Sequence, residues 1–126
     1  MENRESFKRP HERLDVWQEA MSLVEMIYAC SSQFPETERF GLTSQIRRAA
    51  VSIPSNIAEG AARRSTNEYK RFLSVARGSL SEMDTQLQLA TRLGFVNSTS
   101  PVDRHVDQLF AKLTALMNAL EKRGVG

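Results

Sequence analysis

Four stretches of this chain carry apolar side chains at steps of three and four residues, which is the period of one face of an α-helix. They cover residues 14–34, 43–61, 66–93 and 100–123, and short polar links join them. No stretch has the convincing alternation of a strand. The pattern predicts an all-α fold, and the simplest architecture is an antiparallel up-down-up-down four-helix bundle over residues 13–123.

The N-terminal segment 1–12 is highly charged and lacks an apolar face, so we expect a flexible tail there. It also lacks the apolar centre of a signal peptide. No part of the chain approaches the roughly 18 uncharged apolar residues that a membrane span needs. Cys30 is the single cysteine and suits a reducing compartment. We therefore expect a cytoplasmic protein without a membrane partner.

The first helical stretch carries two apolar stripes. The stronger stripe consists of Trp17, Ala20, Met21, Val24, Ile27 and Tyr28, and the weaker one of Val16, Leu23 and Cys30. A helix that is apolar on more than one side contacts more than its own bundle or lies centrally within it.

Pro54 lies in the middle of the second helical stretch. Proline has no N–H, so the carbonyl of Ala50 loses its usual helical partner. Three polar side chains nearby can bond freed backbone groups: Ser52, Ser55 and Asn56. We predict one continuous helix kinked at Pro54, and the alternative is two short helices with a break there.

Capping residues mark several helix ends. Ser65 and Glu68 have the spacing of a capping box, in which the serine hydroxyl accepts the backbone N–H three residues later. Gly94 predicts the end of the third helix, and Pro101 predicts the first turn of the fourth. Gly78 lies inside the third helix, where glycine costs up to about 1 kcal/mol. We therefore expect another helix to approach closely at Gly78.

Basic side chains concentrate in one part of the chain. Residues 39–77 contain eight Arg or Lys and two Glu, a local charge of +6, whereas the whole chain carries +2. Four of these basic residues flank the link between the second and third helices: Arg63, Arg64, Lys70 and Arg71. We predict that these four form a nucleic-acid-binding surface. The alternatives are a solvated face with intramolecular ion pairs, or burial at subunit interfaces.

Asn56 and Glu59 lie three residues apart and share one helix face. A carboxylate withdrawn from water needs a cationic partner, and Arg48 and Arg77 are candidates on the second and third helices. We predict a structural polar network of Arg48, Asn56, Glu59 and Arg77 that fixes the packing of the two helices. The alternative is that Asn56 and Glu59 contact a ligand.

The chain lacks the sequence motifs of common enzyme classes. HExxH, GxSxG, a phosphate-binding glycine loop and the ExxH of di-iron bundles are absent. His11 lies in the predicted tail and His105 lies early in the last helix, and neither belongs to a recognisable ligand set. We therefore expect no enzymatic activity, no catalytic residue, no metal and no cofactor.

Three strings of the sequence resemble one known family. They are LDVWQEAM at 14–21, FPETERFGLTSQIRRAAVSIPSNIAEGAARRS at 34–65 and NEYKRFLSVARGSLSEMDTQLQLATRLG at 67–94. They resemble the bacterial four-helix-bundle proteins related to the 23S rRNA intervening-sequence protein. This family also includes the accessory variability determinant of diversity-generating retroelements. The string around SIPSNIAEG is highly specific.

The resemblance implies a left-handed bundle that assembles with copies of itself into a ring of five. One relative is a basic ring associated with a reverse transcriptase and with nucleic acid. The resemblance thus implies a homopentameric scaffold with RNA or DNA as an expected partner. The main alternative is an adaptor for a protein partner, such as an accessory factor of a reverse transcriptase or polymerase. A small-ligand site in the bundle or ring is a third hypothesis.

Overall fold

The computed structural model of the chain describes residues 9–125. Its elements are the 3-10 helices η1 (Pro10–Arg13) and η2 (Glu36–Glu38) and the α-helices α1 (Asp15–Ser31), α2 (Leu42–Ala61), α3 (Thr66–Arg92) and α4 (Ser100–Val125). The described residues contain no β-strand. The predicted all-α fold with four helices is confirmed.

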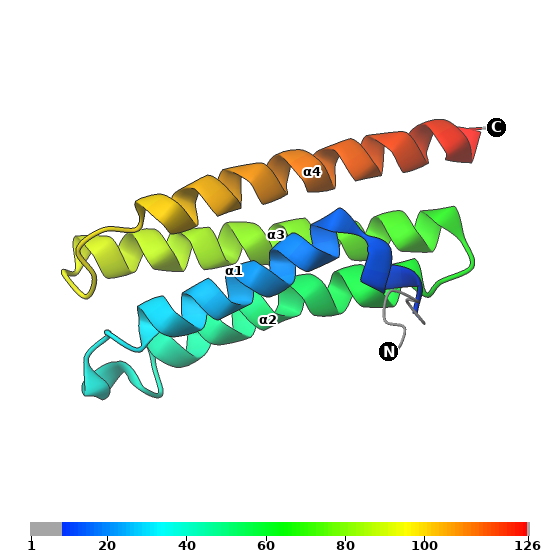
Figure 1. The fold of residues 1–126 in the computed structure, drawn as a ribbon. Helices are drawn as coiled ribbons and strands as arrows, with labels where there is room; N and C mark the ends of the chain where they lie inside the picture. The colour runs from blue at the N-terminus through cyan, green and yellow to red at the C-terminus, as the bar shows by residue number, and fades with distance from the viewer. Residues whose placement is uncertain (1–8, 126) are drawn as a thin grey trace, which may run out of the picture.

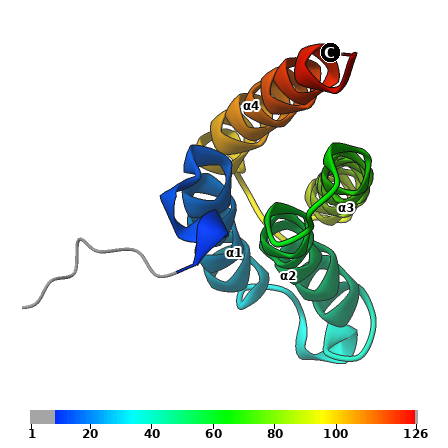
Figure 2. The same ribbon diagram turned by 90° about the vertical axis from the view of Figure 1, so that its right-hand side faces the viewer.

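The four α-helices form one bundle. Figure 1 shows that the chain turns back at each of the three connections, so the helices lie alongside one another. Figure 2 looks along the bundle and shows the helices around a shared interior. Each helix packs against the next in the chain, and α4 closes the bundle by also packing against α1. The prediction of a four-helix bundle is therefore confirmed.

Aliphatic side chains from all four helices fill the interior. The largest completely buried ones are Leu23, Ile27, Ile46, Ile53, Ile57, Leu73, Leu80, Met83, Leu87, Leu109 and Leu113. Burial of one such side chain contributes roughly 1.5–3 kcal/mol. Between residues 9 and 125, no helix is both long enough and apolar enough to cross a membrane.

The core-facing side of α1 takes residues from both apolar stripes. Val16 and Leu23, which belong to the predicted weaker stripe, are buried. Met21 and Tyr28, which belong to the stronger stripe, are 40% and 43% exposed. The steps 16, 20, 23 and 27 also fit a helical period, and the core-facing line runs between the two stripes. As a result, α1 keeps an apolar face outside the core.

The helix α2 continues through Pro54 without a break, as predicted. Ser55 Oγ donates to the carbonyl of Val51 at 2.9 Å, and Asn56 Nδ2 donates to the carbonyl of Ser52 at 2.8 Å. These side chains supply hydrogen bonds to carbonyls in the turn that precedes proline, where the backbone ladder is interrupted. The kink at Pro54 stays a prediction.

The close approach between helices occurs at Gly60 rather than at Gly78. A Cβ added at Gly60 would lie 2.8 Å from the Cβ of Phe72 and 3.2 Å from the carbonyl oxygen of Tyr69, both on α3. A Cβ added at Gly78 would meet no atom within 4 Å. Our expectation for Gly78 was wrong, because this residue lies on the exposed side of α3.

Both ends of α3 follow the signals in the sequence. Ser65 Oγ accepts the backbone N–H of Glu68 at 3.1 Å, which confirms the predicted N-cap. At the other end, Gly94 has φ of 78°, and the N–H of Phe95 reaches the carbonyl of Ala90 at 2.8 Å. This is a Schellman-type helix end, which needs the positive φ that glycine adopts at little cost.

Residues 10–12 belong to the predicted tail, yet they lie in η1, which contacts α1 and α2. Pro10–Arg13 forms η1, and the His11 ring lies edge-on to Trp17 of α1, with 4.8 Å between the ring centres. Proline suits the first turn of such a helix because its φ is already fixed there. The rest of the predicted flexible tail falls mainly on residues 1–8, which lie outside the described residues.

Candidate functional site

The basic residues that we predicted at the link between α2 and α3 lie close to carboxylates. We call Arg63, Arg64, Lys70 and Arg71 the turn cluster. Arg63 pairs with Glu59 at 2.8 Å and lies 4.0 Å from Glu68, while Lys70 bonds to Glu121 of α4 at 2.5 Å. These local partners lower the positive field that the turn cluster presents to an anion.

Two arginines of the turn cluster also contact an aromatic ring. The guanidinium groups of Arg63 and Arg71 lie 4.9 Å and 4.8 Å from the centre of the Phe72 ring. Arg64 is exposed and has no hydrogen bond or ion pair with any described residue. Of the four predicted residues, Arg64 is therefore the least restrained by its surroundings.

The structure does not bring the predicted polar network together as one unit. Asn56 donates to Ser52 Oγ at 2.9 Å, and Ser52 Oγ lies 2.9 Å from Ser79 Oγ, which links α2 to α3. Glu59 pairs with Arg63 on its own helix, because four residues separate the two on one helix face. It does not pair with the predicted arginines of either helix.

The two arginines that we predicted as partners of Glu59 lie elsewhere. Arg77 donates to Thr114 Oγ1 at 2.9 Å and so links α3 to α4. Arg48 is exposed and has no hydrogen-bond or ion-pair partner among residues 9–125. An arginine without a partner keeps its full set of donors for a ligand.

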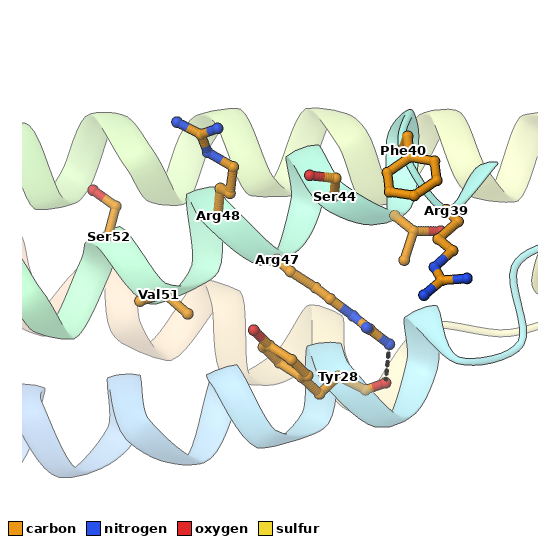
Figure 3. A pocket seen from close by; sticks show the side chains of 9 residues that line it. Tyr28, Arg39, Phe40, Ser44, Arg47, Arg48, Val51 and Ser52 are labelled. Atoms are coloured by element: carbon orange, nitrogen blue, oxygen red, sulfur yellow. Dashed lines mark hydrogen bonds between the residues drawn. The ribbon is translucent and has the colours of Figure 1, made fainter.

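Arg48 belongs to a hollow that we call the α1–α2 cleft. This cleft has a volume of about 660 Å³ and lies between the N-terminal half of α2 and the end of α1 (Figure 3). Its lining consists of Tyr28, Arg39, Phe40, Thr43, Ser44, Arg47, Arg48, Val51 and Ser52. The lining thus holds three arginines and no carboxylate, in contrast to the turn cluster.

Arg47 is held in a fixed position on one side of the cleft. Its Nε donates to Ser31 Oγ at 2.8 Å, and a terminal nitrogen donates to the carbonyl of Tyr28 at 3.3 Å. Its guanidinium also lies 4.5 Å from the centre of the Tyr28 ring (Figure 3). A cation at the end of α1 is favourable, because the carbonyl end of a helix carries partial negative charge.

Phe40 stands at the mouth of the cleft and is 88% exposed. The guanidinium of Arg39 lies 5.3 Å from the centre of its ring. The next turn of the chain is held because Glu38 Oε1 accepts the backbone N–H of Leu42 at 3.0 Å, at the start of α2. Phe40 is therefore an apolar side chain displayed to solvent beside an ordered helix start.

Phe40 and Arg48 also line a second hollow, on the other side of α2. This α2–α3 hollow of about 500 Å³ contains Ser79 and Glu82 of α3. Figure 3 shows Arg47 reaching from α2 toward α1, whereas Arg48 points away from α1. The side chains of Arg47 and Arg48 therefore lie on opposite sides of the exposed surface of α2.

An apolar groove continues from the cleft along the same pair of helices. It is lined by His11, Trp17, Met21, Val24, Val51, Pro54, Ser55 and Ala58. Val51 lines both the groove and the cleft and is 41% exposed. The outer apolar face of α1 therefore ends beside the three arginines of the cleft.

The remaining candidates for chemistry among the described residues are metal-ligand side chains, Cys30 and His105. Within residues 9–125, no group of three or more His, Cys, Asp or Glu side chains is placed to hold a metal ion. Cys30 is a free thiol, and burial raises its pKa, so less of the reactive thiolate forms at neutral pH. His105 is half-buried, and its Nδ1 has no hydrogen-bond partner among the described residues.

The sequence analysis missed the α1–α2 cleft, although part of its signal is local. Arg39, Phe40, Arg47 and Arg48 lie within ten residues, and basic residues interleaved with an aromatic are typical of nucleic-acid-binding surfaces. The contribution of Tyr28 depends on the packing of α1 against α2, which the sequence alone does not specify.

Comparison with known proteins agrees with the resemblance seen in the sequence. The family model for the 23S rRNA-intervening sequence protein matches residues 12–121, which include the cleft, the groove and the turn cluster. A search of curated proteins found no match. Because the family model matches most of the chain, the chain belongs to the 23S rRNA-intervening sequence protein family.

Proposed function

We propose that this chain is a non-enzymatic, homo-oligomeric scaffold of the cytoplasm that binds RNA or DNA through the α1–α2 cleft. The observation that carries the proposal is the composition of the cleft lining, which holds Arg39, Arg47 and Arg48 and no carboxylate. Arginine is well suited to phosphate because its planar donors match two phosphate oxygens at once. Arg47 reaches toward α1 and Arg48 points to the opposite side of α2, so a phosphate backbone that crosses this part of α2 would meet positive charge on both sides.

The cleft suits this role better than the turn cluster does. At the turn, Glu59 and Glu68 lie against Arg63, and Glu121 lies against Lys70, so a phosphate has to compete with carboxylates. In the cleft, Arg48 has no such competitor among the described residues. Arg39 has only an exposed pair with Glu36 at 3.5 Å, and exposed pairs of this kind contribute little.

Self-association is the second part of the proposal, and a ring of five copies is the expected assembly. Support comes from the apolar face that α1 keeps outside the core, where Met21 and Tyr28 are each about two-fifths exposed, and from Val51 of α2, which is exposed to the same degree. This face borders a groove of about 390 Å³ whose lining is mostly apolar. Covering such a surface with a second copy would remove it from water. In a closed ring, every copy would present its cleft in the same way.

An adaptor for a protein partner is the alternative function. It is favoured by the same apolar face and by the exposure of Phe40, since aromatic residues and arginine are enriched at protein interfaces. Under this alternative, the chain co-purifies with a defined protein and has no affinity for RNA or DNA.

The test is binding of nucleic-acid-free protein to labelled RNA and DNA at low and near-physiological salt, measured by fluorescence anisotropy. Arg39→Gln/Arg48→Gln removes two charges from the cleft, and Arg64→Gln/Arg71→Gln removes the same charge from the turn cluster. We expect only the cleft variant to bind weakly. Its salt dependence should fall by roughly 0.7–0.9 in logarithmic slope per lost phosphate contact.

The solution mass of each variant must equal that of the wild type, so that a change in assembly is not mistaken for a change in the binding surface. Loss of binding only in the turn-cluster variant would mean that the binding surface is the turn cluster, as predicted from the sequence, and not the cleft. No binding by the wild type at either salt would refute the nucleic-acid role and favour the adaptor. A wild-type mass equal to one chain would refute the oligomeric part.

A further inference from the structure

We infer that the α1–α2 cleft accepts one unpaired nucleotide of a single strand, with its base stacked on Phe40 and its phosphate bound by Arg48. This inference rests on the proposed function and makes it more specific, because it names the form of nucleic acid. A double helix keeps its bases stacked inside and cannot offer one to an aromatic ring on a protein surface. The cleft should therefore prefer single strands.

The first argument is the position of Phe40. A phenylalanine that is 88% exposed leaves most of its ring in water, outside the apolar core of the bundle. The bond between Glu38 and the N–H of Leu42 fixes the turn that carries it. An aromatic face presented in this way is a stacking platform, and every nucleobase has a π-face that fits it.

The second argument is the arrangement of side chains that follow Phe40 along α2. Ser44, Arg48 and Ser52 come at steps of four residues and so share one face of α2, and Phe40 lies two residues before the helix begins. All four line both the α1–α2 cleft and the α2–α3 hollow. The two serines are small and leave space beside Arg48, where a phosphate next to a stacked base would lie.

The third argument is the size and charge of the site. A volume of about 660 Å³ lies within the range of roughly 300–1,000 Å³ that is usual for small-molecule sites. Arg47 is already oriented by Ser31 and Tyr28, and Arg39 lies over the Phe40 ring. These positions surround the site with positive charge without closing it. The α1–α2 cleft has no carboxylate in its lining, which favours a nucleotide over a protein segment, and the α2–α3 hollow on the other side of Arg48 has one, that of Glu82.

The experiment compares three labelled ligands. Two have the same sequence, a single strand containing 2-aminopurine and the corresponding duplex, and the third is the free nucleotide adenosine monophosphate. The variants are Phe40→Ala, Phe40→Trp and Leu93→Ala, and Leu93 serves as the control because it is also exposed, at 60%, but lies beyond the end of α3. Anisotropy gives the affinity, and 2-aminopurine fluorescence reports stacking of the base.

We expect Phe40→Ala to lose roughly 5- to 150-fold in affinity for the single strand and to leave duplex binding unchanged. Phe40→Trp should retain single-strand binding, because it keeps the aromatic face, and Leu93→Ala should match the wild type. Quenching of 2-aminopurine on binding should disappear in Phe40→Ala. The solution mass of Phe40→Ala should equal that of the wild type.

Several outcomes would overturn the inference and are distinguishable from failure of the proposed function. If the wild type binds duplex and single strand equally, or if Phe40→Ala binds the single strand normally, nucleic-acid binding stands and base stacking does not. Free nucleotide bound as tightly as the strand would assign the cleft to a small ligand. A change of solution mass in Phe40→Ala would assign Phe40 to a protein interface. No binding of any nucleic acid would refute both proposals.

Discussion

The same substitution at two glycines should have opposite effects on stability. In Gly60→Ala, the new methyl group would lie 2.8 Å from the Cβ of Phe72, although two carbon atoms pack best at about 3.5–4.0 Å. The neighbouring atoms are a Cβ and the backbone oxygen of Tyr69, so no rotation of a flexible side chain can relieve the contact. The helices α2 and α3 must instead move apart.

The magnitude follows from two opposing terms. Overpacking of this kind costs about 1–3 kcal/mol, and the upper half of that range applies where backbone must move. Replacing glycine by alanine inside a helix returns up to about 1 kcal/mol. We therefore expect Gly60→Ala to lower the free energy of unfolding by about 1–2 kcal/mol. In Gly78→Ala only the second term acts, because nothing lies within 4 Å, and we expect a gain of about 0.5–1 kcal/mol.

The assay is urea unfolding followed by far-ultraviolet circular dichroism at one fixed protein concentration, with the solution mass measured for each variant. The concentration must be fixed because assembly contributes to apparent stability. Equal effects at the two positions would refute the packing argument for Gly60. A loss of stability in Gly78→Ala would refute the conclusion that this side of α3 is open, and would indicate that another copy packs there.

Three further predictions concern individual contacts. Ser65→Ala should lower the free energy of unfolding by about 1 kcal/mol in the same urea assay, because it removes the N-cap of α3. Hydrogen bonds to Asp15 and Glu19 raise the pKa of Lys112 above its usual 10.5. Their contribution to stability is complete below pH 10.5 and is lost as pH rises through the raised pKa, so Lys112→Met should remove this alkaline loss from the pH profile of unfolding. Because burial raises the pKa of Cys30, iodoacetamide should modify it slowly at neutral pH and faster in urea.

The features that the sequence predicted well depend on residues close to one another in the chain. The N-cap at Ser65 and the turn at Gly94 are set by the backbone needs of a few neighbouring residues, and both occur where the sequence indicates. The positions of the four helices follow in the same way from their apolar period. The core-facing side of α1 does not, because two stripes satisfy the period and the packing of the neighbouring helices buries residues of both.

The electrostatic character of the turn cluster shows a different limit. Lys70 forms an ion pair with Glu121, which is 51 residues away in sequence, so no local pattern could reveal the pair. The pair of Arg63 with Glu59 is different, because a spacing of four residues on a helix is visible in the sequence and favours an ion pair. Counting charges over residues 39–77 shows that the region is basic, but it does not show which of its basic side chains lack a carboxylate partner.

The cleft combines both kinds of information. Arg39, Phe40 and Arg48 are close in sequence, yet their value as a site depends on the absence of carboxylates from the lining, and that is a property of the packed helices. Val51 then joins the cleft to the apolar groove, so a second copy that covers the groove would lie at the edge of the cleft. Assembly and ligand binding would then act on one continuous surface, and each would change the free energy of the other. This is why the effect of a cleft variant on nucleic-acid binding has meaning only when its solution mass is known.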